Sequence, residues 1–247
     1  MPKRDTRLKI VGHRGAKGLA PENTIASFEK ALKYHVDEIE LDARVTSNGQ
    51  VVVHHDGFIT DPAGDKLEID SYTLDELRLH KPDLTTLQEA ITKINRQVPV
   101  VIEVKPGVPT KPVARIVEDF IKEGWSTKDF CLASRSMPIL KELHTRFPEI
   151  EIMVIDFWSG VRATWRARKL GTRRIGMLEY GLWPGFIASM KRGGYELYSA
   201  PPGTPQKERL LSKFGLAGQT NSAARARRWE RYGLTGVITD FPDRFTK

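Results

Sequence analysis

The sequence predicts an α/β fold, a (β/α)8 TIM barrel with a short insertion after the second strand and its hairpin. Short apolar runs alternate with amphipathic helical patterns along the 247 residues, as expected for a parallel sheet covered by helices. Eight apolar runs can be counted, and a barrel of eight strand–helix units usually has about 250 residues. Hydrophobic residues make up 40% of the chain, which is enough for a large core.

The first half of the chain shows this alternation clearly. The expected order is a strand over 8–13, a helix over 24–34 capped by Thr24, and a strand over 38–45. The turn Asn48-Gly49 then returns the chain as a hairpin strand over 51–55. Residues 57–83 are polar, and we expect them to form the short insertion. The elements that follow are a helix over 85–95, a strand over 98–104, a helix over 112–123, a strand over 130–134, a helix over 138–146 and a strand over 150–157.

The second half is harder to divide. Residues 159–192 contain one or two helices and a run of basic residues. The remaining strands are expected over 196–200, 216–220 and 236–239, with helices over 206–214 and 223–232 between them. An open doubly wound sheet is the alternative, but no Gly-x-Gly-x-x-Gly follows the first strand. Since no linker or repeat is visible, we expect one domain over residues 1–247.

The composition limits the cellular compartments and the binding partners that can be expected. With 39 basic against 31 acidic residues the formal charge is +8, which favours phosphates, nucleic acid or an acidic membrane surface without choosing among them. The single cysteine, Cys131, cannot form an internal disulfide, and we expect it to be buried and inert. The charged N-terminus has no apolar signal core, and no stretch is long enough to span a membrane. We therefore expect a cytoplasmic protein.

Three carboxylates fall at the ends of neighbouring strands, where a barrel holds its catalytic groups. Glu40 and Asp42 lie two positions apart on one strand and therefore share a face. Glu103, at the end of the adjacent strand, would be a third oxygen ligand. Such a set suits one divalent cation, Mg²⁺ or Ca²⁺, better than zinc. The alternative is a structural network in which the acids pair with nearby cations, namely Arg14, Arg44 and Lys105.

Cations and histidines end at the same rim. Arg14 and Lys105 beside a metal suit a substrate with negative charge on oxygen, above all a phosphate. His13 follows the first strand, and the pair His54-His55 ends the hairpin. Two histidines can share acid–base work, one taking the nucleophile's proton and the other protonating the leaving alkoxide. Strand alternation sends one of His54 and His55 inward, and spacing alone does not say which.

Together these motifs resemble the glycerophosphodiester phosphodiesterase family. The matching text is His13-Arg14-Gly15, Pro21-Glu22-Asn23-Thr24, Glu40-x-Asp42, Val53-x-His55-Asp56, Thr85-x-Leu87-x-Glu89, Glu103-x-Lys105 and Thr239-Asp240. The resemblance covers residues 10 to about 242 and is strongest before residue 106. It implies the (β/α)8 barrel and the hydrolysis of glycerophosphodiesters to glycerol 3-phosphate and an alcohol.

The resemblance also implies a role for each of these residues. The expected sites are the catalytic pair His13 and His55, the metal ligands Glu40, Asp42 and Glu103, and the phosphate-binding cations Arg14 and Lys105. The expected partner is a small anionic phosphodiester, and no nucleic acid is expected. The nucleophile is either water or the glycerol 2-hydroxyl.

Four departures from the family pattern lie in regions that are expected to shape the substrate-binding part of the site. Phe58 to Asp61 stands where an Arg is usual, and the insertion is short. The late Trp-Thr-x-Asn motif reads Gly218 to Asn221, and Ser134-Arg135 replaces Ser-Phe. These departures leave hydrolysis intact and, with the tryptophans, open one alternative, a lysophospholipase D-type reaction on lysophospholipids. The basic segments 162–174 and 224–231 open another, a non-catalytic barrel that binds an anionic polymer.

The basic segments and four aromatic residues could each be functional or purely structural. The basic segments 162–174 and 224–231 could contact nucleic acid or anionic lipid, but we expect solvated helix faces. Four aromatic residues could line a pocket or face a membrane, and we expect core packing for them, namely Trp158, Trp165, Trp183 and Phe186. Peripheral membrane contact stays open, and the sequence does not indicate an oligomeric state. Glu22 and Asn23 are expected to shape their loop and cap the helix.

Overall fold

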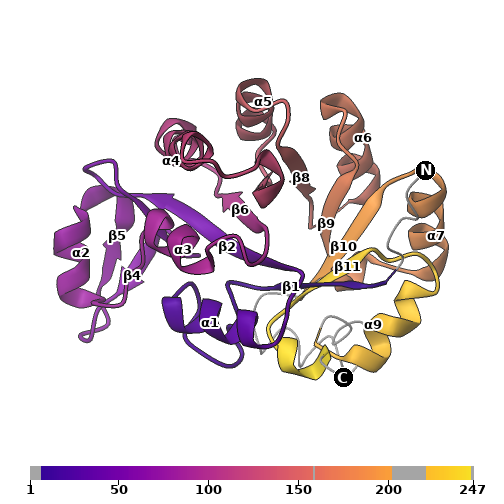
Figure 1. Ribbon diagram of the computed structural model, residues 1–247, viewed down its shortest axis with the longest axis horizontal. Coiled ribbons are helices and arrows are strands. Elements are labelled where there is room, and N and C mark those ends of the chain that lie inside the picture. The colour runs from indigo at the N-terminus through magenta and orange to yellow at the C-terminus, as the bar shows by residue number, and fades with distance from the viewer. Residues whose placement is uncertain (1–6, 158, 202–220, 246–247) are drawn as a thin grey trace.

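Eight parallel strands close into a ring in the computed structural model, which describes residues 7–157, 159–201 and 221–245. The ring closes because the first strand pairs with both the second and the last. The strands are β1 (Lys9–Gly12), β2 (Glu38–Val45), β6 (Val100–Val104), β7 (Phe130–Ser134), β8 (Glu151–Ile155), β9 (Arg174–Leu178), β10 (Glu196–Ala200) and β11 (Gly236–Thr239). The predicted (β/α)8 barrel is confirmed (Figure 1).

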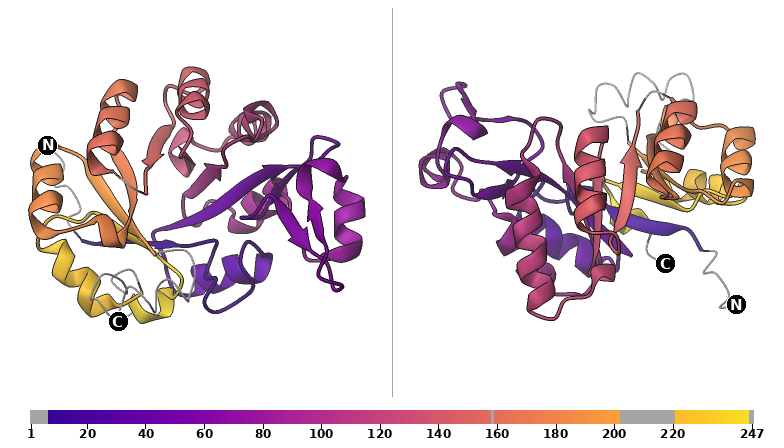
Figure 2. Two further views of the ribbon diagram at one scale, coloured as in Figure 1. Left: turned by 180° about the vertical axis from the view of Figure 1, so that it is seen from behind. Right: turned by 90° about the horizontal axis from the view of Figure 1, so that it is seen from above.

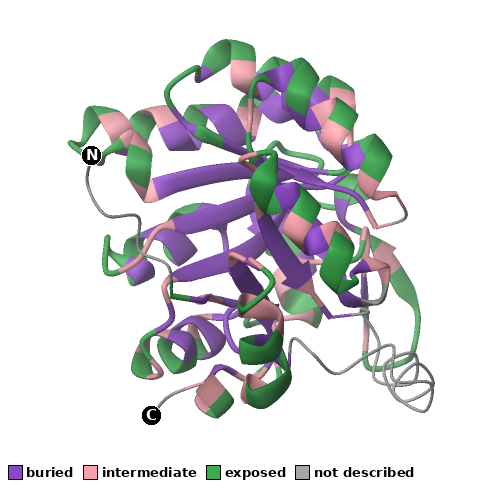
Figure 3. Ribbon diagram, turned by 90° about the vertical axis from the view of Figure 1, so that its right-hand side faces the viewer, coloured by how far each residue is buried: buried purple, intermediate pink, exposed green. Residues whose placement is uncertain are grey.

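Helices cover the outside of the ring (Figures 1 and 2). They are α1 (Ile25–Lys33), α3 (Leu87–Ile94), α4 (Thr110–Lys122), α5 (Met137–Arg146), α6 (Gly160–Leu170), α7 (Pro184–Arg192) and α9 (Ala223–Glu230). Their inner faces are buried against the strands and their outer faces are exposed (Figure 3). In α1, for example, Phe28 and Ala31 are fully buried. Thr24 caps this helix as predicted, because its side chain accepts from the amide of Ser27.

The sequence missed one barrel strand. β9 is the sixth strand of the ring, in a segment where only helices were expected. The strand over 196–200, expected as the sixth, is therefore the seventh, so that numbering was wrong. The helix predicted over 206–214 and the strand predicted over 216–220 lie outside the described residues. Since β10 pairs directly with β11, the ring is complete without them.

The predicted insertion is present and has a small core of its own. After the Asn48-Gly49 turn, β3 (Val51–Val53) pairs antiparallel with β2. β4 (Phe58–Thr60) and β5 (Lys66–Glu68) then form a two-stranded sheet, followed by the 3₁₀ turn η1 (Ile69–Ser71) and α2 (Leu74–His80). This unit lies beside the barrel (left in Figure 1) around buried apolar side chains, namely Val52, Ile59, Ile69, Leu74, Leu77 and Leu84. The short 3₁₀ turns η2 (Thr127–Asp129), η3 (Glu179–Gly181) and η4 (Pro242–Phe245) complete the elements of the described residues.

The end of the barrel where the strands begin is filled by a buried ion pair. Arg174 at the start of β9 contacts Glu38 at the start of β2, and its guanidinium lies 4.2 Å from the centre of the Tyr198 ring. Arg174 also donates to Glu151 at 2.7 Å. These contacts link β2, β8, β9 and β10 at the end of the barrel where the strands begin. No described helix combines the length and the apolar character that a bilayer-spanning segment requires.

Cys131 faces the interior of the barrel and should be unreactive in the native protein. Its side chain packs among apolar residues and is 2% exposed, and burial raises the pKa of its thiol to about 12. Because the thiolate is the reactive form, we expect no labelling of the folded protein by an aromatic disulfide reagent at neutral pH. In denaturant the same reagent should label one thiol per chain, since the sequence has one cysteine. Rapid stoichiometric labelling of the folded protein would contradict this burial.

Candidate active site

The open end of the barrel holds a cavity of about 240 Å³ at the carboxyl ends of the strands. Six of the seven residues predicted for the site line it, namely His13, Arg14, Glu40, His55, Glu103 and Lys105. The seventh, Asp42, contacts Lys105, with its Oδ1 2.5 Å from the Lys105 Nζ. The structure therefore brings all the predicted site residues together. His54 is not among the residues that line the cavity.

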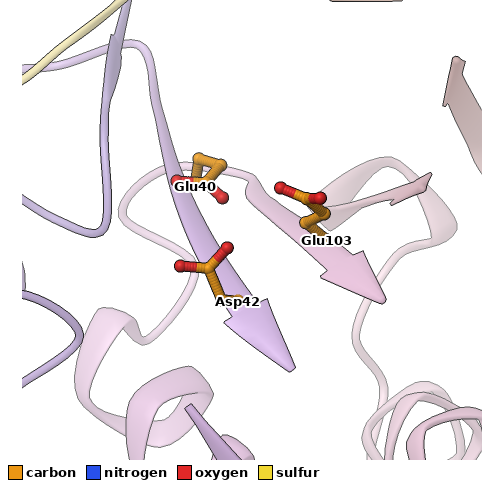
Figure 4. Close-up of side chains that lie close together, drawn as sticks. All are labelled: Glu40, Asp42 and Glu103. Carbon is orange, nitrogen blue, oxygen red and sulfur yellow. The ribbon is translucent and has the colours of Figure 1, made fainter. Parts of the chain in front are cut away.

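Three buried carboxylates converge between β2 and β6 (Figure 4). Asp42 and Glu103 are partners in the parallel pairing, and Glu40 lies two residues earlier on β2. One oxygen from each residue lies within 4.8 Å of the others. Glu103 Oε1 is buried without a hydrogen-bond partner among the described residues. Burial and the neighbouring Asp42 and Glu103 raise the pKa of Glu40 well above its ordinary value. A hard divalent cation fits this set, because its charge would offset the repulsion among the three carboxylates and Glu103 Oε1 could coordinate it.

Two cations also contact the acidic cluster. Lys105 Nζ lies 2.9 Å from Glu103, and Arg14 Nε lies 3.2 Å from Asp42 Oδ2. Burial acts against ionisation of Asp42, but Lys105 and Arg14 outweigh it and hold the pKa of Asp42 below its ordinary value. The ion network considered as an alternative to metal binding is thus present for Arg14 and Lys105. Arg44 instead donates to the backbone carbonyl of His55 at 2.8 Å.

The loop after β1 holds Arg14 in place. Arg14 has a left-handed backbone, with φ of 51°, and its amide donates to Glu40 Oε2 at 2.9 Å. Its Nη1 donates to both carboxylate oxygens of Glu22 at 2.8 Å. Asn23 Nδ2 donates to Asp42 Oδ2 at 2.9 Å. Glu22 and Asn23 therefore do more than the expected shaping of the loop, and the helix cap is Thr24 alone.

His13 is paired with a carboxylate from the last strand end. Its Nδ1 lies 2.6 Å from Asp240 Oδ1. Asn221 Oδ1 accepts from the amide of Asp240 at 3.0 Å and thereby fixes the backbone of this acid. Burial lowers the pKa of His13 to about 4, although Asp240 acts to raise it. The pairing leaves Nε2 as the ring nitrogen that can exchange a proton with a substrate.

His55 has a similar arrangement with the next residue in the chain. Its Nδ1 lies 2.8 Å from Asp56 Oδ1. Burial, together with the nearby Arg14 and Lys105, lowers the pKa of His55 to about 4. The adjacent acid is visible in the sequence, whereas Asp240 lies 227 residues from its histidine. Both acids lie within the motifs of the family resemblance, but neither was predicted to be a site residue.

The other wall of the cavity is largely apolar. It is formed by residues from five of the barrel strands and the loop after β8, including Val101, Met153, Ile155, Phe157, Leu178 and Ile238. Arg135 also lines the cavity, with its guanidinium 4.9 Å from the centre of the Phe157 ring. Its Nε lies 4.0 Å from Glu103 Oε1. The arginine that departs from the family pattern is therefore at the site, on the boundary between its charged and apolar walls.

Known proteins resemble the chain in sequence and in fold. Residues 13–153 match the Glycerophosphoryl diester phosphodiesterase family. The glycerophosphodiester phosphodiesterase of Bacillus altitudinis is 25% identical over 260 residues, which are 97% of each chain. Human lysophospholipase D GDPD1 is 36% identical over 110 residues, which are 42% of this chain and 34% of that protein. The structure of an Oleispira antarctica phosphodiesterase in complex with sn-glycerol-3-phosphate has a TM-score of 0.78 at 20% identity, over 96% of this chain and 94% of that one. At that identity the structural likeness shows the fold.

Proposed function

The chain belongs to the glycerophosphoryl diester phosphodiesterase family, and we propose that it hydrolyses glycerophosphodiesters to glycerol 3-phosphate and an alcohol. One observation carries this proposal: a single cavity is lined by two histidines, by the cations Arg14, Lys105 and Arg135, and by carboxylates of a cluster that could hold a metal ion. Each histidine has its own acidic partner, and hydrolysis of a phosphodiester requires two proton transfers. The Oleispira antarctica phosphodiesterase of similar fold binds the product sn-glycerol-3-phosphate, which supports a small phosphate ester as the product here.

In this proposal the charged wall binds the phosphate. Arg14 and Lys105 would contact its negative oxygens, and both are held by neighbouring acids rather than free to move. Glu40, Asp42 and Glu103 would hold one Mg²⁺ or Ca²⁺ ion, which supplies positive charge where negative charge develops on the phosphoryl oxygens. The apolar wall would receive the part of the substrate that carries no charge.

His13 and His55 would carry the two protons. One imidazole takes the proton of the attacking hydroxyl, which is either water or the glycerol 2-hydroxyl, as its oxygen bonds to phosphorus. The other gives a proton to the alcohol oxygen as its bond to phosphorus breaks, so that the alcohol leaves neutral. With the 2-hydroxyl as nucleophile, water then opens the cyclic phosphate by the same two transfers in reverse.

Asn23 is expected to support the metal cluster without touching the ion. Its side chain holds Asp42 Oδ2 at 2.9 Å, and its backbone has a φ of 57° that glycine adopts without strain. Asn23→Gly should therefore weaken metal affinity roughly 10- to 100-fold, as loss of a ligand's hydrogen-bond partner usually does. Asn95→Gly is the matched control, because Asn95 has a φ of 47° at the end of α3. Metal titrations of activity should separate the two variants, and equal metal affinity in both would contradict the role of Asn23.

The function is tested with a panel of substrates and metals. We expect the purified protein to release glycerol 3-phosphate from glycerophosphocholine in Mg²⁺ or Ca²⁺ and to lose this activity in a chelator. The second candidate is lysophospholipase D-type hydrolysis, which the apolar wall and the resemblance to human lysophospholipase D GDPD1 favour. Turnover of a long-chain lysophospholipid in preference to glycerophosphocholine would support that candidate. An absence of hydrolysis on every member of the panel would refute both and leave the non-catalytic barrel.

A further inference from the structure

Three large apolar side chains are exposed on the surface of α6 and α7. Val161 is 83% exposed, Trp165 is 55% exposed and Trp183 is 59% exposed. Core packing was expected for both tryptophans, and that expectation was wrong. Trp158, the other tryptophan of this region, lies outside the described residues. We refer to Val161, Trp165 and Trp183 as the tryptophan patch.

The two helices that carry the patch contact each other. α6 and α7 lie side by side (Figures 1 and 2), and Thr164 Oγ1 is 3.4 Å from Met190 Sδ between them. Trp183 packs on Phe186, with ring centres 5.1 Å apart. Phe186 in turn lies against Gly160, where a Cβ atom would be 2.3 Å from the Phe186 ring. The absence of a side chain at Gly160 therefore allows α7 to pack closely against the start of α6, next to Val161.

The patch lies on the same rim as the catalytic cavity. α6 begins just after Phe157 and α7 begins a few residues after Leu178, and both of these residues line the cavity. Arg166 Nη1 donates to the carbonyl of Arg135 at 3.2 Å, which ties α6 to another cavity residue. A surface that contacts the patch would therefore be held at the mouth of the site.

Charge around the patch has one sign. Between Phe157 and Arg192 the sequence has eight lysines and arginines, of which Arg174 is buried against Glu38 at the other end of the barrel, and one acid, Glu179, which is 1% exposed. The preceding acid, Asp156, is also buried and is paired with Arg162 at 2.5 Å. Arg168 and Lys169 extend the exposed face of α6 beyond Trp165, and the Lys169 Nζ lies 5.7 Å from the centre of the Trp165 ring.

We propose that the tryptophan patch docks on the surface of an anionic lipid bilayer. Tryptophan settles at the boundary between head groups and acyl chains, and lysine and arginine near the surface are attracted to anionic lipids. A single-stranded nucleic acid is less well matched, because Val161 offers no ring on which a base could stack. The proposal rests on the second candidate function only for its use, which is to hold the cavity at a surface that contains lysophospholipids.

Docking is tested with vesicles and the intact protein, independently of hydrolysis. The protein should sediment with vesicles of phosphatidylcholine and phosphatidylglycerol, and less with vesicles of phosphatidylcholine alone. The double variant Trp165→Gln/Trp183→Gln and the double variant Arg168→Gln/Lys169→Gln should each weaken binding roughly tenfold. The apolar control is Leu79→Gln, since Leu79 is 81% exposed on α2. The charge control is Lys30→Gln/Lys33→Gln on α1, four places round the ring from α6.

Several results would overturn the proposal. Binding that is equal for neutral and anionic vesicles, or equally reduced by the control variants, would show that the patch is not the contact. Binding to a single-stranded oligonucleotide without binding to vesicles would assign the surface to nucleic acid. Hydrolysis of soluble glycerophosphocholine should be unchanged in the patch variants, and this assay separates failed docking from a failed assignment of the enzyme.

Discussion

His13→Ala and His55→Ala are each expected to lower kcat roughly 10²- to 10⁴-fold, the usual contribution of a positioned acid or base. Both rings line one cavity, and each has its Nδ1 fixed by a carboxylate, Asp240 for His13 and Asp56 for His55. With pKa values of about 4, both imidazoles are neutral at pH 7 before substrate binds. One is then ready to accept a proton, and the negative phosphate would favour the charged form of the other.

His54→Ala is the matched control for this pair. His54 is the direct neighbour of His55, but it is not among the cavity residues, and its Nδ1 lies 3.1 Å from the carbonyl of Asp56. We expect near-normal kcat in this variant. Circular dichroism and thermal unfolding of all three variants would establish that each is folded. Undiminished turnover by a folded His13→Ala or His55→Ala protein would refute the two-histidine assignment.

Glu40→Gln is expected to have opposite effects on activity and on stability. Loss of a metal ligand should remove several kcal/mol of transition-state stabilisation, which is roughly a thousandfold or more in rate. In a chelator, however, the variant should be more stable than the parent, because it removes a buried carboxyl that Asp42 and Glu103 repel. The melting temperature would rise by about 2–4 °C for each 1 kcal/mol gained. Added Mg²⁺ or Ca²⁺ should raise the melting temperature of the parent but not of the variant.

The pH dependence of metal binding follows from the same residue. Because the pKa of Glu40 is raised in the metal-free protein, protons compete with the cation for its carboxylate. Metal affinity should therefore increase with pH, and calorimetry in buffers of different ionisation enthalpy should detect the released proton. Glu38→Gln is the control on the same strand, since Glu38 is also buried but contacts Arg174. It should destabilise the fold and leave the metal response intact, and the reverse pattern would refute the triad.

Most of the barrel could be predicted because buried parallel strands have a simple signature. β6 and β7 are unbroken or nearly unbroken apolar runs. β9 was missed because its five residues begin with arginine and contain a glycine, and they follow a basic helix. The helix α2 was also missed inside a polar stretch, although Thr73 and Glu76 form a capping box that the sequence displays.

The sequence predicted the site residues that lie at the ends of strands, but not the residues that support them. Parallel pairing of β2 with β6 places Glu40, Asp42 and Glu103 together whatever the details of packing. The cavity contains His55 rather than His54, as the family resemblance implied. The residues that support them depend on contacts between distant loops. Asn23 reaches Asp42 and Asn221 reaches Asp240 through pairs of hydrogen bonds that sequence spacing does not predict.

We expect the enzyme to become active only after β1 has closed against β11. The proposed metal ligands and phosphate-binding cations lie within residues 14–105, so a chain still under synthesis contains them early. His13 receives its carboxylate only when residue 240 has been added and the last strand has paired with the first. Contacts over such a sequence separation form late and slowly in folding. On refolding, the return of activity should therefore lag behind the return of helix content and report the final closure of the ring.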